Sequence, residues 1–255
     1  MTTEASMSTQ ITTAFVSQYK ANVEHLLQQK GSRLRPFVRV ETQGAEFEYY
    51  DRIGSVDAIE VTSRHSDTPL ISTPHDRRQV SLRDFDWADM IDKTDKIRLL
   101  IDPASPYAQN AAWALGRKMD DIIIEAAHGT AKSGKTGGTS VSFDAASQIA
   151  VNYVESGGAT NSGLTIGKLR KAKELLDSNE TDPSDPRFIA VTSKQITDLL
   201  KTTEVTRSDF NSIKALVQGD INTFMGFQFI RTERVATDSS SYRRVIAWCK
   251  SGLLL

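Results

Sequence analysis

The clearest structural element of the sequence is the stretch DPASPYAQNAAWALGRKMDDIIIEAAHG, residues 102–129. Ser105 and Pro106 predict a helix start, because serine is a favoured N-cap and proline is favoured at the first helical position. A helix from there to Ala127, ending before Gly129, would be about 33 Å long at ~1.5 Å per residue. Its apolar side chains recur at steps of four and three residues and predict one packing face. That face consists of Ala108, Ala112, Leu115, Met119, Ile122 and Ala126.

The segment before this helix is unusually charged. Residues 33–98 carry 11 basic and 13 acidic side chains, so that 24 of these 66 residues, about 36%, are charged. In the whole chain 25% of the residues are charged. Short strand-like alternations occur at Phe37–Val40, Phe47–Tyr49 and Val56–Val61. A long polar β-hairpin is marginal by itself. We therefore expect it to lie on its own domain or on a neighbouring subunit.

The rest of the chain mixes helical and strand patterns. Residues 1–10 are rich in Thr and Ser and predict an unstructured arm, Thr165 is a possible helix cap, and residues 182–186 predict a turn. Helices and strands alternate without a regular βαβ repeat, which indicates the α+β class. The expected helices span 14–29, 143–155, 166–177, 194–201 and 209–217, and the expected strands span 187–192, 224–230 and 243–249.

Composition excludes several classes of protein. The 255 residues carry 31 Lys and Arg against 32 Asp and Glu, a net charge of −1, which argues against a protein whose whole surface binds nucleic acid. A single cysteine, Cys249, excludes an internal disulfide and a Cys-rich zinc site. No run approaches the ~20 apolar residues of a membrane helix, and no signal-peptide pattern opens the sequence. We expect a soluble protein made inside a cell, without membrane contact.

One motif suggests chemistry. Residues Gly129–Thr136 read GTAKSGKT and match the phosphate-binding pattern GxxxxGK[ST], which needs a strand before it and a helix after it. Here the motif follows a helix C-terminus, whose partial charge is negative, and Gly137–Val141 is a poor helix start. A nucleotide-binding enzyme is therefore the alternative hypothesis, and a Gly- and Lys-rich loop is favoured.

Other candidate groups are weaker. The carboxylates of Asp84, Asp86 and Asp89 favour a solvated face over a catalytic pair. The histidines lack metal-ligand spacing. We expect no catalytic residue, no metal and no cofactor. The four histidines are His25, His65, His75 and His128.

The order of these elements resembles the major capsid proteins of tailed bacteriophages, which have the Hong Kong 97-like fold. The resemblance covers nearly the whole chain. It implies an N-terminal arm with an amphipathic helix (1–35), an extended β-hairpin loop (36–88), a peripheral domain with the spine helix 106–127 (89–141), an axial domain (142–237) and a return strand (238–255). The stretches that carry it are 102–107, 114–121, 219–222 through Gly226–Phe227 to Arg234, and 245–248.

The resemblance also implies a function. Such subunits form pentamers and hexamers that close into an icosahedral shell around double-stranded DNA. It implies a virion protein that assembles in the host cytoplasm, with scaffolding, portal and decoration proteins as further partners. A non-viral compartment of the same fold is an alternative. Family chains usually run on past 245–255, so this one is either cut short or closed differently, and no Lys–Asn crosslinking motif can be matched.

Charges of both signs on the extended loop suit contacts between subunits, because they set register and partner choice more than affinity. We expect these contacts to involve Glu46, Glu48, Asp51, Arg52, Arg64, Asp67, Arg77 and Arg78.

Overall fold

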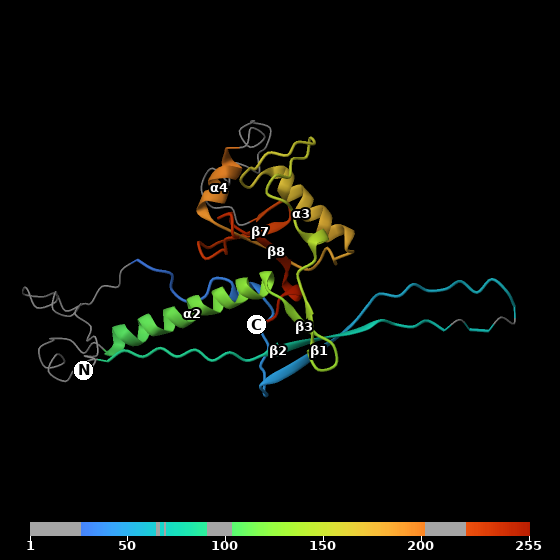
Figure 1. Cartoon of the computed structure of the whole chain (residues 1–255), viewed down its shortest axis with the longest axis horizontal. Coiled ribbons are helices and arrows are strands. Elements are labelled where there is room, and N and C mark those ends of the chain that lie inside the picture. Colours follow the sequence, from blue (N-terminus) through green and yellow to red (C-terminus); the bar gives the residue numbers. More distant parts are fainter. Residues whose placement is uncertain (1–26, 65–66, 69, 91–103, 202–222) are drawn as a thin grey trace, which may run out of the picture. The chain divides into compact units, whose positions relative to one another are not determined.

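A computed structural model describes residues 27–64, 67–68, 70–90, 104–201 and 223–255 (Figure 1). The chain divides into two compact units. Unit 1 comprises Met1–Arg33 and Asp84–Asp121, and unit 2 comprises Leu34–Arg83 and Ile122–Leu255. Of the helices that the structure describes, none combines the length and apolar character required to cross a membrane.

The long helix α2 spans Ala104–His128 and confirms the helix predicted at 106–127. Its residues 104–121 belong to unit 1 and its last turns to unit 2. The predicted helix 14–29 lies almost entirely outside the described residues, and residues 27–30 are not helical.

A mixed sheet organises the core of unit 2. Its strands are β6 (Thr223–Phe224), β7 (Phe227–Arg231), β5 (Arg187–Val191) and β8 (Ile246–Cys249), in that spatial order. Strand β5 pairs parallel with β7 and antiparallel with β8, and all five of its residues are buried. A strand buried on both faces explains the continuous apolar sequence there.

The two faces of this sheet carry separate hydrophobic clusters, because successive side chains of a strand point to opposite faces. Ile189 and Val191 pack with helices α3 (Ile166–Ser178) and α4 (Ser193–Leu200). Phe188 and Ala190 pack on the opposite face with Leu34, Val38, Ile123, Ile124, Ile230, Val235, Ile246 and Trp248. Figure 1 shows α3 and α4 near β7.

Several local predictions are confirmed. Helix α3 begins after Thr165, whose hydroxyl accepts a hydrogen bond from the Lys168 amide at 3.3 Å. Strand β5, helix α4 and the turn at 182–186 also lie where the sequence places them. The predicted helix 209–217 lies outside the described residues.

The prediction of a helix at 143–155 is wrong. Only a 3-10 turn, Ala145–Ser147, forms there. The Asp144 carboxylate caps it by accepting from the Ala146 amide, and the chain is extended again at Gln148. Short polar side chains offer the backbone such local bonds in place of a continuing helix.

The single strand predicted at 224–230 is also wrong. Met225 (φ 53°) and Gly226 (φ 86°) form a two-residue turn of the kind that favours a tight hairpin, so β6 and β7 are two antiparallel strands. The last predicted strand, 243–249, is shortened to β8.

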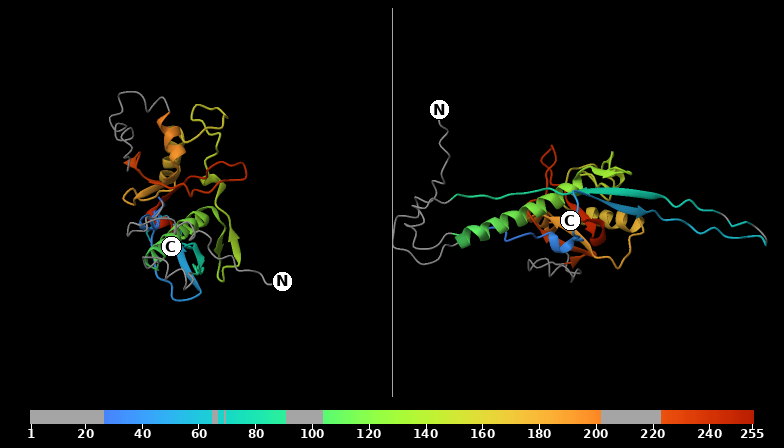
Figure 2. Two further views of the ribbon diagram at one scale, coloured as in Figure 1. Left: turned by 90° about the vertical axis from the view of Figure 1, so that its left-hand side faces the viewer. Right: turned by 90° about the horizontal axis from the view of Figure 1, so that it is seen from below.

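A second sheet is antiparallel throughout. It has the order β1 (Phe47–Ile53), β2 (His75–Ser81), β3 (Ala131–Ser133) and β4 (Thr139–Val141), and the four strands belong to unit 2. The blue β1 and the teal β2 run side by side in the right-hand view of Figure 2. The strand predicted at Phe47–Tyr49 is confirmed, and the hairpin spans the segment from β1 to β2.

The other two predicted strands of this region do not form. Residues Arg35–Phe37 make a 3-10 turn with Pro36 near its start, and Arg39 bridges to Leu254. Residues 56–61 have no strand partner in the part of the chain that the structure describes, and the apolar side chains of Val56, Ile59 and Val61 are exposed. Alternation alone does not make a strand without a partner for its backbone.

Candidate functional site

The β1–β2 hairpin is held by charges that face each other across the two strands. The register places Asp51 opposite Arg77 and Arg52 opposite Asp76. Arg77 donates twice to Asp51, from Nε to Oδ1 at 2.5 Å and from Nη2 to Oδ2 at 3.1 Å. Arg52 pairs with Asp76, which also lies 3.9 Å from Nε of Arg78. Opposite charges at facing positions stabilise a strand pair and fix its register.

Asp76 also joins the hairpin to the neighbouring strand β3. Its carboxylate accepts from the Ser133 hydroxyl at 2.5 Å and from the Arg77 amide at 2.8 Å. These two donors and the Arg52 guanidinium hold the pKa of Asp76 well below its usual range, with the Ser133 bond as the largest cause. The Gly134 amide donates to the Arg77 carbonyl at 3.1 Å. The base of the hairpin is therefore fixed within unit 2.

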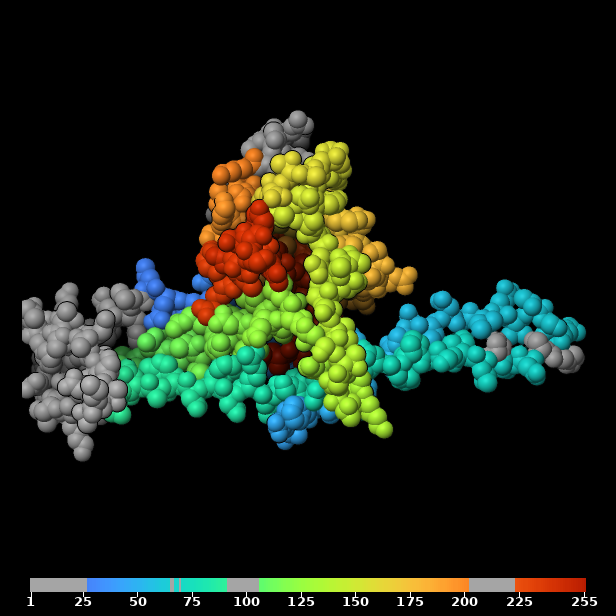
Figure 3. Space-filling model, in the orientation of Figure 1, coloured from blue at the N-terminus to red at the C-terminus, as the bar shows by residue number. Residues whose placement is uncertain are grey.

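Large apolar side chains are exposed along the hairpin. Ile53 is 69% exposed and Leu70 is 97% exposed. A run of exposed apolar residues on one projection marks a surface that contacts another protein. Figure 3 shows the connecting loop on the surface of the space-filling view. The exposed set is Phe47, Tyr49, Ile53, Val56, Ile59, Val61, Leu70, Ile71 and Leu82.

The outer edge of β1 has no strand beside it within the described residues. The Leu82 amide donates to the Glu46 carbonyl at 3.2 Å and the Gly54 amide to the Pro74 carbonyl at 2.9 Å. Both bonds join an even-numbered residue to its partner across the hairpin, and hydrogen-bonded and non-bonded pairs alternate in an antiparallel ladder. The odd-numbered residues 47–53 therefore direct their backbone N–H and C=O groups away from β2. Such an edge is able to pair with a strand of another chain.

The structure brings the predicted contact residues together on this hairpin. Glu46 precedes β1, three lie in β1, Arg64 and Asp67 lie in the connecting loop, and two lie in β2. Four of them, Asp51, Arg52, Arg77 and Arg78, take part in ion pairs within the chain. Oε2 of Glu48 is buried without a hydrogen-bond partner among the described residues. Their contact with a second subunit stays a prediction.

Helix α2 buries a different stripe from the predicted packing face. Of that face, Ala108, Ala112, Leu115 and Ala126 are exposed, and Met119 and Ile122 are half-buried. The buried residues include Gly116, Asp120, Ile123 and Ile124. Two of these are small or charged, so a hydrophobic pattern does not detect them.

Asp120 and Gly116 hold the segment before Leu34 against the helix in unit 1. The Asp120 carboxylate, fully buried, accepts from Gln29 Nε2 and Ser32 Oγ at 2.5 Å each and from the Arg33 amide at 3.0 and 3.1 Å. One turn away, a side chain on Gly116 would place its Cβ 2.6 Å from Cα of Gly31. Sequence reasoning missed this pair, although its spacing of four residues on one helix face is a usable signal.

In a comparison of the sequence with models of protein families, residues 11–255 match the family described as phage capsid protein. The chain belongs to this family. A comparison with curated protein sequences finds no match.

Solved phage capsids have a similar fold. The capsid of Ralstonia phage GP4 has a TM-score of 0.67 at 10% identity, covering 93% of this chain and 80% of that one. The capsid of cyanophage P-SCSP1u has a TM-score of 0.64 at 14% identity, with coverage of 93% and 78%. The mature capsid of bacteriophage PhiM1 has a TM-score of 0.60 at 12% identity, with coverage of 92% and 77%. The expected α+β capsid fold and the expected bacteriophage capsid protein, a structural protein of the virion, are therefore confirmed.

The GxxxxGK[ST] motif does not have phosphate-binding geometry in this phage capsid protein. Residues Gly129–Thr136 run from the end of α2 through β3 into the turn before β4, and no helix follows directly in this described stretch. Gly134 and Gly137 adopt positive φ in that turn, and Lys132 Nζ donates to Ser140 Oγ at 3.0 Å. The motif therefore forms β3 and the turn of the β3–β4 hairpin. The expectation that residues 129–136 form only a Gly- and Lys-rich loop is wrong.

The remaining candidate groups form no reactive cluster. Within the described ranges, no three His, Cys, Asp or Glu side chains gather as metal ligands. Cys249 is buried, and desolvation raises the pKa of its thiol. Burial likewise lowers the pKa of His128, whose Nε2 lies 3.1 Å from the Arg244 carbonyl. His25 and His65 lie outside the described residues.

Proposed function

We propose that copies of this chain assemble into pentamers and hexamers that close into an icosahedral shell around double-stranded DNA. The β1–β2 hairpin carries the proposal. Its base is fixed by ion pairs and by Ser133, while its apolar side chains and the outer edge of β1 are exposed. A projection that is fixed at its base and has uncovered apolar surface favours contact with a neighbouring copy, and repeated heterologous contacts of this kind close into rings.

The proposed organisation follows the family. Residues 1–35 serve as an arm, 36–88 as the extended loop, 89–141 with 238–255 as the peripheral domain, and 142–237 as the axial domain. Assembly takes place in the host cytoplasm, with scaffolding, portal and decoration proteins as further partners. Basic side chains on the inner face contact DNA phosphates without sequence preference.

Electron microscopy of the purified chain tests this proposal. The expected result is closed shells or free pentamers and hexamers, and a chain that stays monomeric at every concentration would contradict it. Nucleic acid extracted from particles made during infection distinguishes a virus shell, which contains genomic DNA, from a compartment that encloses other cargo. Titration with ATP and magnesium is expected to show no binding, because the Gly129–Thr136 hairpin lacks the helix that a phosphate site requires.

A further inference from the structure

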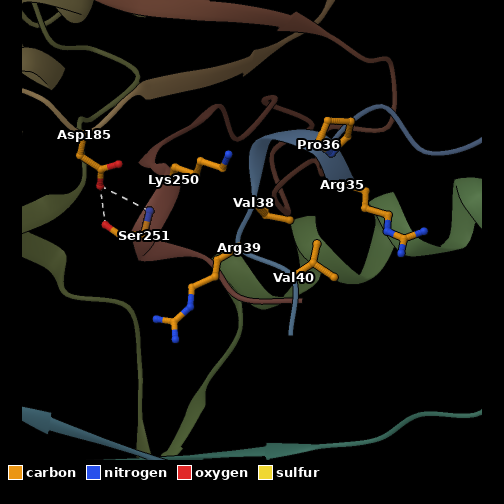
Figure 4. A pocket seen from close by; sticks show the side chains of 8 residues that line it. All are labelled: Arg35, Pro36, Val38, Arg39, Val40, Asp185, Lys250 and Ser251. Carbon is orange, nitrogen blue, oxygen red and sulfur yellow. Dashed lines mark hydrogen bonds between the residues drawn. The ribbon is translucent and has the colours of Figure 1, made fainter. Parts of the chain in front are cut away.

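Unit 2 carries a basic hollow at the surface. Its volume is about 690 Å³, and it lies between the segment that follows Leu34 and the segment that follows β8 (Figure 4). Three cations line it, Arg35, Arg39 and Lys250, beside the apolar side chains of Pro36 and Val40.

The hollow is lined by one carboxylate, Asp185, in addition to the three cations. Asp185 accepts one hydrogen bond from the Ser251 hydroxyl and a second from the Ser251 amide at 3.4 Å (Figure 4). Arg39 pairs with Glu41. Lys250 is exposed, and no carboxylate of the described chain pairs with its Nζ. The hollow therefore favours an acidic group with an apolar neighbour.

Unit 1 exposes a segment of matching chemistry. Residues 84–90 read DFDWADM and lie outside any helix or strand. Asp84, Asp86 and Asp89 are exposed and have no salt bridge within the described part of the chain, and Trp87 is 40% exposed. Lys118 Nζ lies 5.1 Å from the centre of the Phe85 ring, which anchors the segment on α2.

We propose that residues 84–90 of one copy dock into the Arg35–Arg39–Lys250 hollow of a second copy, a contact that rests on the proposed assembly. Carboxylates of the segment face the cations, and the Trp87 ring covers Pro36 and Val40. Charge complementarity selects this occupant: the segment brings carboxylates beside an indole, and the hollow brings Lys250, whose Nζ has no carboxylate partner within the described chain, beside an apolar wall.

A charge exchange tests the contact. Lys250→Glu and Asp86→Lys each change an exposed residue, so each variant folds, and each is expected to raise several-fold the concentration needed for particles. The chain with both changes restores assembly, because the two exchanged side chains again face each other with opposite charges. Mixing the two single variants restores it in part, because the segment and the hollow lie on different copies and only contacts between unlike variants are matched. Lys173→Glu and Glu180→Lys, both exposed and away from the hollow, are matched controls without effect.

Peptide binding gives a readout that does not depend on particles. A fluorescein-labelled peptide of residues 84–90 is expected to bind the full unassembled chain. It should bind Lys250→Glu about fivefold more weakly and Lys173→Glu with unchanged affinity.

The outcomes separate the two proposals. A wild-type chain that binds no peptide, single variants that assemble like wild type, or a double variant that is not rescued would each overturn the docking contact. Rescue in the double variant with no gain at all on mixing would place the contact within one copy and also overturn it. A wild-type chain that binds the peptide but forms no particle would refute the assembly and leave the docking contact supported.

Discussion

Three exposed apolar side chains of the hairpin offer a substitution that should separate folding from assembly. Ile53, Ile59 and Val61 are 69%, 54% and 62% exposed in the single chain. Replacing all three with Thr keeps the β-branched shape and removes apolar surface. We expect the variant to fold normally and to lose assembly.

The exposed fractions give the size of the effect. Burying a CH₂ group contributes about 0.8 kcal/mol, and Ile→Thr removes two carbon groups while Val→Thr removes one. Weighted by the exposed fractions, the triple change removes about 2.5 kcal/mol of binding free energy from a contact that covers these side chains. This loss corresponds to a roughly 70-fold weaker association. Surface substitutions change the free energy of unfolding by only about 0.5 kcal/mol each.

The assay compares particle formation with thermal unfolding. Sedimentation velocity over a concentration series measures the fraction of subunits in particles, and circular dichroism measures the Tm of the unassembled chain. Leu169→Ala is the control: this buried residue of α3 is expected to lower the free energy of unfolding by about 2–5 kcal/mol while leaving the assembly surface in place. A triple variant that assembles at the wild-type concentration would refute the assignment of the hairpin as a contact surface.

Three further predictions concern contacts within the chain. Gly116→Ala forces a Cβ against the Gly31 backbone and should lower the free energy of unfolding by about 1–3 kcal/mol, measured by denaturant titration; an unchanged midpoint would contradict the close approach. Lys168 Nζ donates to three backbone carbonyls of residues 151–163, so Lys168→Met should lower stability by about 1–3 kcal/mol and speed amide exchange in that loop, with Lys173→Met as the control. The lowered pKa of Asp76 means that its bonds stabilise the folded hairpin fully above the ordinary carboxyl pKa of 3.8 and lose this effect as the pH falls below that value. Acid should therefore reduce the protection of the β2 amides, relative to their intrinsic exchange rates, more in the wild-type chain than in Asp76→Asn, which keeps the acid-sensitive Asp51–Arg77 pair. Equal acid sensitivity of the two chains would contradict this prediction.

Local signals account for the elements that the sequence predicts well. Helix α2 has a proline at its start and a glycine after its end, and α3 has the Thr165 cap. Strand β5 is apolar at nearly every position because both of its faces are buried. In each case a single segment contains the whole signal.

Non-local pairing accounts for what the sequence does not predict. Strand β2 reads HDRRQVS and has no apolar alternation; it forms because its charges meet β1 and Ser133, residues 24 or more positions away. The buried stripe of α2 depends on the Gly31 backbone and on donors to Asp120 from residues 29–33. The apolar alternation at 56–61 is plain in the sequence, but no strand forms there, because the described part of the chain supplies no partner strand for it.

Cryo-electron microscopy of particles assembled from the purified wild-type chain would show directly whether the hairpin lies between subunits. We expect a closed icosahedral shell of pentamers and hexamers in which residues 47–81 of each copy lie on a neighbouring copy and cover Ile53, Ile59 and Val61. Particles in which these side chains stay in solvent, or a chain that forms no shell at all, would contradict this expectation.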